Sequence, residues 1–198
     1  LILVFLGAIG YALFSDQSFL VSQEIPNEEV VLRDDLPELP VLGKASEIAG
    51  IHEWINAEPL TLQELRGKVV LVDFWTYSCI NCIRTLPHLK SWHEKYKDDG
   101  FVLLGVHTPE FEFEKKFENV LANVQENDIT YPVALDNDYT TWRAFQNRYW
   151  PASYLVDEKG NIRYTHFGEG RYNKTESAIQ ALLVEAGLLS RGKTDQAA

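Results

Sequence analysis

Residues 69–87, V-V-L-V-D-F-W-T-Y-S-C-I-N-C-I-R-T-L-P, contain both cysteines of the chain, Cys79 and Cys82. The run at 69–74 is β-branched and apolar apart from Asp73, which is typical of a strand buried on both faces. After the cysteines, apolar residues recur at helical spacing, at Ile83, Leu86, Leu89 and Trp92. The stretch therefore predicts a buried strand that leads through a C-x-x-C motif into a helix.

A C-x-x-C motif at the start of a helix suits thiol–disulfide exchange. Two cysteines in the first turn can bring their sulfurs together with little backbone movement. Cys79 would lie where free backbone N–H groups and the helix dipole favour the thiolate, which is the attacking species. Cys82, one turn further along, could attack the resulting mixed disulfide and release the partner. We therefore predict that this redox-active pair works without a bound cofactor.

Zinc binding and haem attachment are other uses of a cysteine pair. The chain has no further cysteine, and His93 lies eleven residues beyond Cys82, roughly 16 Å along a helix. His88 is closer but is rotated to a different face. Ile83 occupies the position where C-x-x-C-H requires a histidine. We therefore predict no metal site here, and a purely structural disulfide remains the plain alternative.

Longer motifs resemble the thioredoxin superfamily. Residues 73–87, D-F-W-T-Y-S-C-I-N-C-I-R-T-L-P, are similar to its active-site segment, most closely in the extracytoplasmic, membrane-tethered TlpA/ResA-like branch. Four later segments resemble the DipZ type, in which a thioredoxin-like domain is fused to a CcdA-type membrane domain: G-V-H-T-P-E-F, Y-P-V-A-L-D-N-D-Y, Y-W-P-A-S-Y-L-V-D and H-F-G-E-G. The resemblance covers about residues 50–187. It implies an α/β thioredoxin-like fold, with a central mixed β-sheet flanked by helices.

The resemblance also implies catalytic roles outside the cysteines. Asp73 matches the buried acid of thioredoxins, which helps to move the proton of the deeper cysteine; a hydrogen-bonded structural aspartate is the alternative. Glu110 resembles a glutamate that the membrane-tethered branch keeps near its cysteines, where it could shuttle protons. A solvated loop glutamate is the alternative for Glu110.

Substrate contacts are expected from four residues. Pro151 matches the cis-proline of the superfamily, whose loop exposes backbone groups that pair with a bound peptide. Trp150, next to it, could narrow the groove or stack on a substrate. Trp75 and Tyr77 precede Cys79 and are expected to line the rim of the site.

Hydrophobic periodicity outlines the remaining elements. Strands are expected at 48–55, 101–107 and 132–136, and helices at 78–97, 112–125 and 176–189. Segments 153–157 and 161–167 flank E-K-G-N, a glycine-containing turn that favours an antiparallel hairpin.

The ends of the chain differ from its middle. Residues 1–14 carry no charge and predict the tail end of a transmembrane helix or an uncleaved anchor, with a signal-peptide core as the alternative. Residues 15–47 read as an acidic, extended linker, whose L-P-E-L-P-V-L-G segment could add an edge strand. Residues 48–189 would form the thioredoxin-like domain, and 190–198 a disordered tail. Acidic rather than basic residues after the apolar segment favour an exit outside the cytoplasm.

Composition limits the partners. With 198 residues and 45% hydrophobic content, the chain can form one globular domain plus extensions. Its formal net charge of −11 argues against nucleic acid, whose phosphates would be repelled.

These observations predict a membrane-tethered thiol–disulfide oxidoreductase, acting outside the cytoplasm as a reductase of protein disulfides. If the DipZ-type resemblance holds, a CcdA-type membrane domain supplies electrons, and apocytochrome c is one candidate acceptor. A peroxiredoxin-like peroxidase is an alternative, because Thr76 and Cys79 form a T-x-x-C, although Val72 stands where that motif expects a proline. A Cu(I)-binding protein using both thiols and His107 or His166 is another.

Overall fold

The computed structural model describes residues 36–190. The anchor expected at 1–14, the first part of the expected linker and the tail beyond residue 190 lie outside the described residues. Within 36–190, no helix has both the length and the apolar character needed to cross a bilayer.

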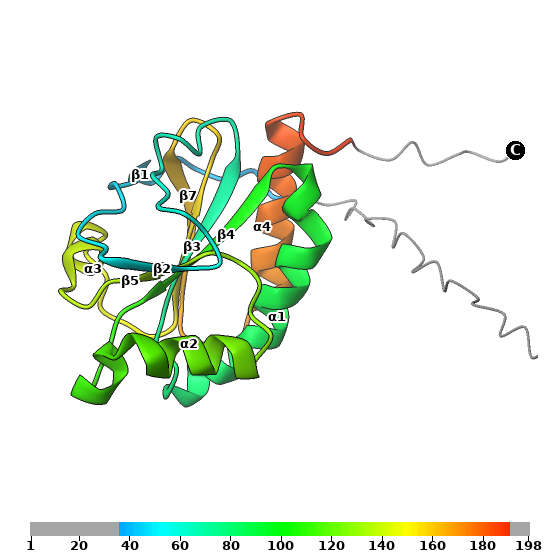
Figure 1. Ribbon diagram of the computed structural model, residues 1–198. Helices are drawn as coiled ribbons and strands as arrows, with labels where there is room; N and C mark the ends of the chain where they lie inside the picture. The colour runs from blue at the N-terminus through cyan, green and yellow to red at the C-terminus, as the bar shows by residue number, and fades with distance from the viewer. Residues whose placement is uncertain (1–35, 191–198) are drawn as a thin grey trace, which may run out of the picture.

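The described residues form a seven-stranded mixed sheet in the order β1-β7-β6-β3-β4-β5-β2 (Figure 1). Strands β3, β4 and β5 are parallel to one another, and each remaining strand pairs antiparallel to its neighbour. The strands are β1 (Gly43–Lys44), β2 (Glu53–Ile55), β3 (Val69–Trp75), β4 (Phe101–His107), β5 (Val133–Leu135), β6 (Ala152–Val156) and β7 (Asn161–Phe167). The predicted α/β thioredoxin-like sheet is therefore confirmed.

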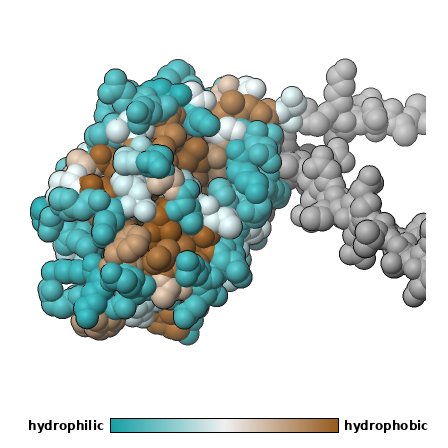
Figure 2. All heavy atoms as spheres, in the orientation of Figure 1, coloured by the Kyte–Doolittle hydropathy of each residue, from teal (hydrophilic) through white to brown (hydrophobic). Residues whose placement is uncertain are grey.

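Helices cover both faces of this sheet. They are α1 (Ile80–Tyr96), α2 (Phe117–Glu126), α3 (Thr140–Ala144) and α4 (Tyr172–Glu185), with short 3-10 turns η1 (Lys97–Asp99) and η2 (Glu112–Lys115). One apolar cluster joins α1, α2 and α4 to the sheet, and a second joins α3 and residues 48–65 to the opposite face. Polar side chains cover most of the face in view, and apolar atoms show through between β2 and α2 (Figure 2).

Strand β3 is buried along its whole length. Because successive side chains of a strand point to opposite faces, they enter the two apolar clusters in turn. Val69 and Leu71 face α1 and α4, whereas Val70 and Val72 face the α3 side. By the same alternation Asp73 points toward α1, beneath the cysteines. The position of this carboxylate thus follows from the two-residue period of the strand.

Some element boundaries differ from those predicted. The helix expected at 112–125 is interrupted at Lys116, whose extended backbone (φ −75°, ψ 121°) separates η2 from α2. The helix expected at 176–189 runs instead over Tyr172–Glu185, and it ends before Gly187, which has a φ of +70°. The strand expected at 48–55 is reduced to β2, because the Ala49 N–H donates to the Thr141 hydroxyl (3.0 Å) instead of a neighbouring strand.

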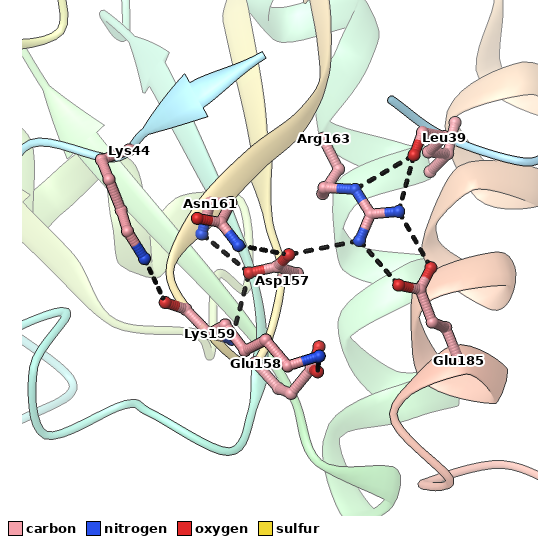
Figure 3. A network of polar contacts seen from close by, with 8 residues as sticks. All are labelled: Leu39, Lys44, Asp157, Glu158, Lys159, Asn161, Arg163 and Glu185. Carbon is pink, nitrogen blue, oxygen red and sulfur yellow. Dashed lines mark hydrogen bonds and ion pairs between the residues drawn. The ribbon is translucent and has the colours of Figure 1, made fainter. Parts of the chain in front are cut away.

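Arg163 of β7 attaches the segment before β1 to the domain (Figure 3). Its guanidinium donates to both carboxylate oxygens of Glu185 (2.8 and 3.0 Å), to Asp157 (3.2 Å) and to the Leu39 carbonyl (2.6 and 3.1 Å). Only 9% of Arg163 is exposed, so these charge-assisted bonds are largely shielded from water. Together with β1, which pairs with β7, they show that the last part of the expected linker belongs to the folded unit.

Candidate active site

The two cysteines lie at the start of α1, directly after the carboxyl end of β3. Cys79 is the N-cap of the helix and is partly exposed, whereas Cys82 is 2% exposed and faces the core. Both are free thiols. The Ile83 N–H donates to the Cys79 carbonyl (3.0 Å), which fixes the first turn. Cys79 is therefore the sulfur that a foreign disulfide can reach.

Cys82 is held in its protonated form. Burial raises the pKa of Cys82 well above its ordinary value, and the neighbouring Cys79 and Asp73 raise it further. A buried thiol of this kind attacks a disulfide only after a base has taken its proton. The geometry therefore calls for a proton acceptor on the core side of Cys82.

Asp73 is placed to be that acceptor. The carboxylate is 1% exposed; its Oδ1 accepts a hydrogen bond from the Ser153 hydroxyl (2.7 Å), and its Oδ2 has no partner among the described residues. Burial raises the pKa of Asp73 to about 7, although the Ser153 hydrogen bond works in the opposite direction. A carboxyl group with such a pKa can gain and lose a proton near neutral pH.

Gly105 of β4 lies directly opposite Asp73 in the sheet. A Cβ atom at this position would lie 3.0 Å from the Trp75 indole nitrogen and 3.1 Å from Cε2 of Tyr131. The glycine therefore leaves room for both rings beside the Asp73 side chain. Tyr131 opens the Y-P-V-A-L-D-N-D-Y segment, but nothing in that segment indicates that the ring of this residue lies beside Asp73.

Trp75 does not line the rim, which corrects the prediction made for it. Its side chain is 1% exposed and packs in the same apolar cluster as Val69 and Leu71. The cause is the strand period: Trp75 is two positions after Asp73 and shares its face. A substrate at Cys79 cannot reach this ring.

Tyr77 and His107 form a stacked pair beside the cysteines. Their ring centroids are 5.7 Å apart with an interplanar angle of 16°, and Tyr77 is partly exposed. Burial lowers the pKa of His107 to about 4, so this imidazole is neutral at pH 7. Tyr77 thus lies at the edge of the site, and its substrate contact stays a prediction.

The Trp150–Pro151 peptide bond is cis, as the resemblance implied. The Trp150 carbonyl oxygen lies 4.0 Å from the Cys79 sulfur, so this loop forms one wall beside the exposed cysteine. The Trp150 ring packs on Trp142 at a centroid distance of 4.2 Å, and its indole N–H donates to the Thr108 carbonyl (3.0 Å). Trp150 is therefore held in place and is not free to swing onto a substrate.

Glu114 is a buried carboxylate that sequence reasoning missed. It is 0% exposed and accepts hydrogen bonds from the Ser78 hydroxyl (2.5 Å) and from the Ser78, Glu110 and Phe111 backbone N–H groups (3.3, 2.6 and 2.9 Å). Glu110 itself is exposed, so its predicted catalytic role stays a prediction. Three glutamates alternate over 110–114, and only the fold selects the one that turns inward.

Glu114→Gln should lower the free energy of unfolding at pH 7 by about 1–3 kcal/mol, because an amide N–H₂ would face backbone donors. Burial alone would raise the pKa of Glu114, but its hydrogen bonds outweigh burial and lower it. A lowered folded-state pKa contributes stability that is present at neutral pH and lost as the pH falls below the ordinary value. The deficit should therefore shrink in acid, as urea unfolding at pH 7 and pH 4 can measure.

The exposed Glu112, whose side chain is 87% accessible, provides a matched control. Glu112→Gln should unfold like the parent protein at both pH values. If the Glu114 and Glu112 variants proved equally stable at pH 7, Glu114 would not hold this loop.

The two alternative functions find little support in the geometry. The Thr76 hydroxyl lies 3.3 Å from the His107 ring nitrogen and faces Glu114, not Cys79 as a peroxidase T-x-x-C would need. Within residues 36–190, no group of three or more His, Cys, Asp or Glu side chains is arranged to hold a metal ion. The copper alternative therefore lacks a third ligand in the part of the chain that the structure describes.

Known proteins resemble this chain in sequence and in fold. Residues 48–165 match the AhpC/TSA family. Protein DipZ of Mycobacterium tuberculosis (strain CDC 1551 / Oshkosh) is 49% identical over 156 residues, which are 77% of this chain and 22% of DipZ. Thiol-disulfide oxidoreductase YkuV of Bacillus subtilis (strain 168) is 31% identical over 139 residues, 70% of this chain and 93% of YkuV.

A solved structure agrees with these relatives. The solution structure of a thioredoxin-like protein in the oxidized form has a TM-score of 0.66 and 30% identity, and the match covers 72% of this chain and 96% of that one. This chain spans only about a fifth (22%) of the length of the curated DipZ proteins. The helix-terminal cysteine pair, the thioredoxin-like sheet and these matches together lead to one conclusion: the chain belongs to the AhpC/TSA family and is a thioredoxin-like thiol–disulfide oxidoreductase.

Proposed function

We propose that this chain reduces protein disulfides outside the cytoplasm and is held to a membrane by its N-terminal segment. The observation that carries the proposed disulfide reduction is the partly exposed Cys79 beside a buried pair of proton-exchanging groups, Cys82 and Asp73. The Cys79 sulfur is accessible to a protein partner, whereas the Cys82 sulfur is shielded from solvent and reacts only after Cys79 has formed a mixed disulfide.

The reaction follows from this arrangement. The Cys79 thiolate attacks one sulfur of the partner disulfide, and the other sulfur leaves as a thiolate that takes a proton from water. Cys82 gives its proton to Asp73 and attacks the Cys79 sulfur, which releases the second partner sulfur as a thiolate that in turn takes a proton from water. Two electrons pass to the partner, and Cys79 and Cys82 end as a disulfide that a further dithiol must reduce.

The electron donor in this proposal is a CcdA-type membrane domain, and the acceptors are oxidised extracytoplasmic thiols such as those of apocytochrome c. Support comes from the DipZ resemblance, since DipZ-type proteins combine both kinds of domain in one chain. The uncharged residues 1–14, followed by the acidic Asp16 and Glu24, support an anchored, outward-facing arrangement.

The reduction potential of the Cys79/Cys82 pair tests the direction of electron flow. A reductase should have a potential near that of thioredoxin, about −270 mV, and equilibration with dithiothreitol or glutathione buffers can measure it. A value near about −120 mV, as in DsbA, would instead make the protein an oxidant. Fusing alkaline phosphatase after residue 198 of the full-length protein tests the location, because that reporter is active only outside the cytoplasm.

A further inference from the structure

Exposed apolar side chains gather at the end of the sheet that carries Cys79. Apart from Val41 and Leu42, the exposed large apolar residues of the described chain come from four segments at the carboxyl end of β3, namely the start of α1, the loop after β4, the loop before β6 and the end of β7: Ile80, Ile83, Phe111, Phe113, Tyr149 and Phe167. Tyr149 and Phe167 flank the cis-proline loop, where a peptide partner is already expected. The two phenylalanines lie on the opposite side, in the loop after β4, and no role has been assigned to them.

Phe111 and Phe113 form a stacked pair that faces solvent. Their rings are 5.5 Å apart at an interplanar angle of 6°, and each residue is 49% exposed. Tyr77 completes the surface, with its ring centroid 6.2 Å from that of Phe113. Because Tyr77 is two residues before Cys79, this aromatic surface borders the reactive sulfur.

The loop that carries the pair is fixed by hydrogen bonds at several points. The Phe113 carbonyl accepts from the Tyr77 hydroxyl (3.3 Å) and from the Asn119 amide (2.8 Å), and Glu114 holds the Phe111 N–H. The Thr108 carbonyl accepts from Trp150. The two rings are therefore exposed on a rigid support, although the same loop buries Glu114 completely. Exposed aromatic rings on a pre-organised loop are typical of a binding surface.

Charge indicates the kind of partner. Exposed carboxylates of Glu110 and Glu112 flank the aromatic pair. Glu112 is paired with Lys115 (2.6 Å) but its side chain remains 87% accessible, whereas Glu110 makes no ion pair among the described residues. A cation over an aromatic face gains from the ring quadrupole, and adjacent carboxylates add to the attraction. The net charge of −11 acts in the same direction at longer range.

We propose that the Phe111–Phe113 pair, with Glu110 and Glu112, binds a Lys- or Arg-bearing segment of the partner polypeptide close to its disulfide. This inference rests on the proposed function and adds the substrate class: disulfides that lie beside basic residues. The aromatic pair acts on one side of Cys79, and the cis-proline loop acts on the other.

Three disulfide-bonded peptides that differ at two positions beside the cysteine, carrying Lys, Gln or Glu there, provide the test. Each kcat/KM is divided by that variant's rate with hydroxyethyl disulfide, a small uncharged substrate. The parent protein should prefer the Lys peptide over the Glu peptide by roughly fivefold to tenfold, through KM. Phe111→Ser with Phe113→Ser should reduce that ratio to near one, and Glu110→Gln with Glu112→Gln should reduce it without loss of apolar surface.

The exposed Val41 and Leu42 provide the matched control, because they lie just before and within the segment that reaches β1, away from the four segments at the carboxyl end of β3. Val41→Ser with Leu42→Ser should keep the parent's preference. Equal rates for all three peptides, or a preference that survives the phenylalanine substitutions, would overturn the inference. A parent protein that reduces none of the peptides would instead reject the proposed function itself.

Discussion

Cys79→Ser will abolish the reduction of protein disulfides. The serine hydroxyl cannot replace a thiolate as the attacking group, and Cys82 is too deeply buried to take over. The rate of insulin disulfide reduction should fall by at least about a thousandfold, to the level of the uncatalysed reaction. The loss should affect kcat/KM for every disulfide substrate, small or large, because the missing atom is the nucleophile.

Cys82→Ser separates the two roles. Cys79 should still attack but nothing should then release the partner, so the mixed disulfide accumulates. Mass spectrometry of this variant after exposure to an aryl disulfide should show one adduct on Cys79. If the Cys82 variant turned over normally while the Cys79 variant trapped the partner, the assignment of the two sulfurs would be reversed.

Asp73→Asn should stabilise the reduced protein at pH 8 by up to about 4 kcal/mol, which is about three pKa units at about 1.36 kcal/mol each. Burial raises the pKa of Asp73 from 3.8 to about 7, so the folded state binds a proton more tightly than the unfolded state between these values. The native aspartate therefore costs nothing below pH 3.8, and its cost grows until about pH 7. Urea unfolding from pH 4 to pH 8 should show the difference between variant and parent widening over this window.

The exposed Asp98, on η1, is the control for this measurement. The difference in free energy of unfolding between Asp98→Asn and the parent should stay constant over the same pH range. If the free energies of unfolding of the Asp73 variant and the parent differed by the same amount at every pH, burial would not destabilise the charged carboxylate.

The same substitution should slow the release of the partner by about a hundredfold, since the Cys82 thiol would lose its proton acceptor. Single-turnover release of thionitrobenzoate from the mixed disulfide isolates this step from the initial attack. The parent rate should rise with pH through about 7, and the variant should lack that inflection. Unchanged release would assign Asp73 a structural role only.

The sequence was most informative where periodicity decides the outcome. The apolar runs of β3 and β4 and the glycine turn between β6 and β7 predicted those strands almost to the residue, because a buried strand allows few other patterns. The cysteine spacing placed both sulfurs at the helix start. These features depend on neighbours in sequence, which a single chain displays directly.

It was less informative where contacts come from distant segments. The rim position predicted for Trp75 was wrong because the identity of the side chain was considered before the face of the strand on which it lies. Glu114 escaped notice because nothing local distinguishes it from Glu110 and Glu112; its partners at Ser78 come from a loop 36 residues away. The room that Gly105 leaves for Tyr131 likewise depends on strand pairing.

The contact between Leu39 and Arg163 lies at the opposite end of the domain from the cysteines. Arg163 lies near the turn between β6 and β7, and this turn adjoins the amino end of β3. The cysteines follow the carboxyl end of β3. The two ends of this strand are roughly 20 Å apart at the usual rise per residue. The polypeptide before Leu39 thus joins the domain at the pole remote from the sulfurs. A protein partner that binds at the cysteine end therefore leaves the Leu39–Arg163 contact in place.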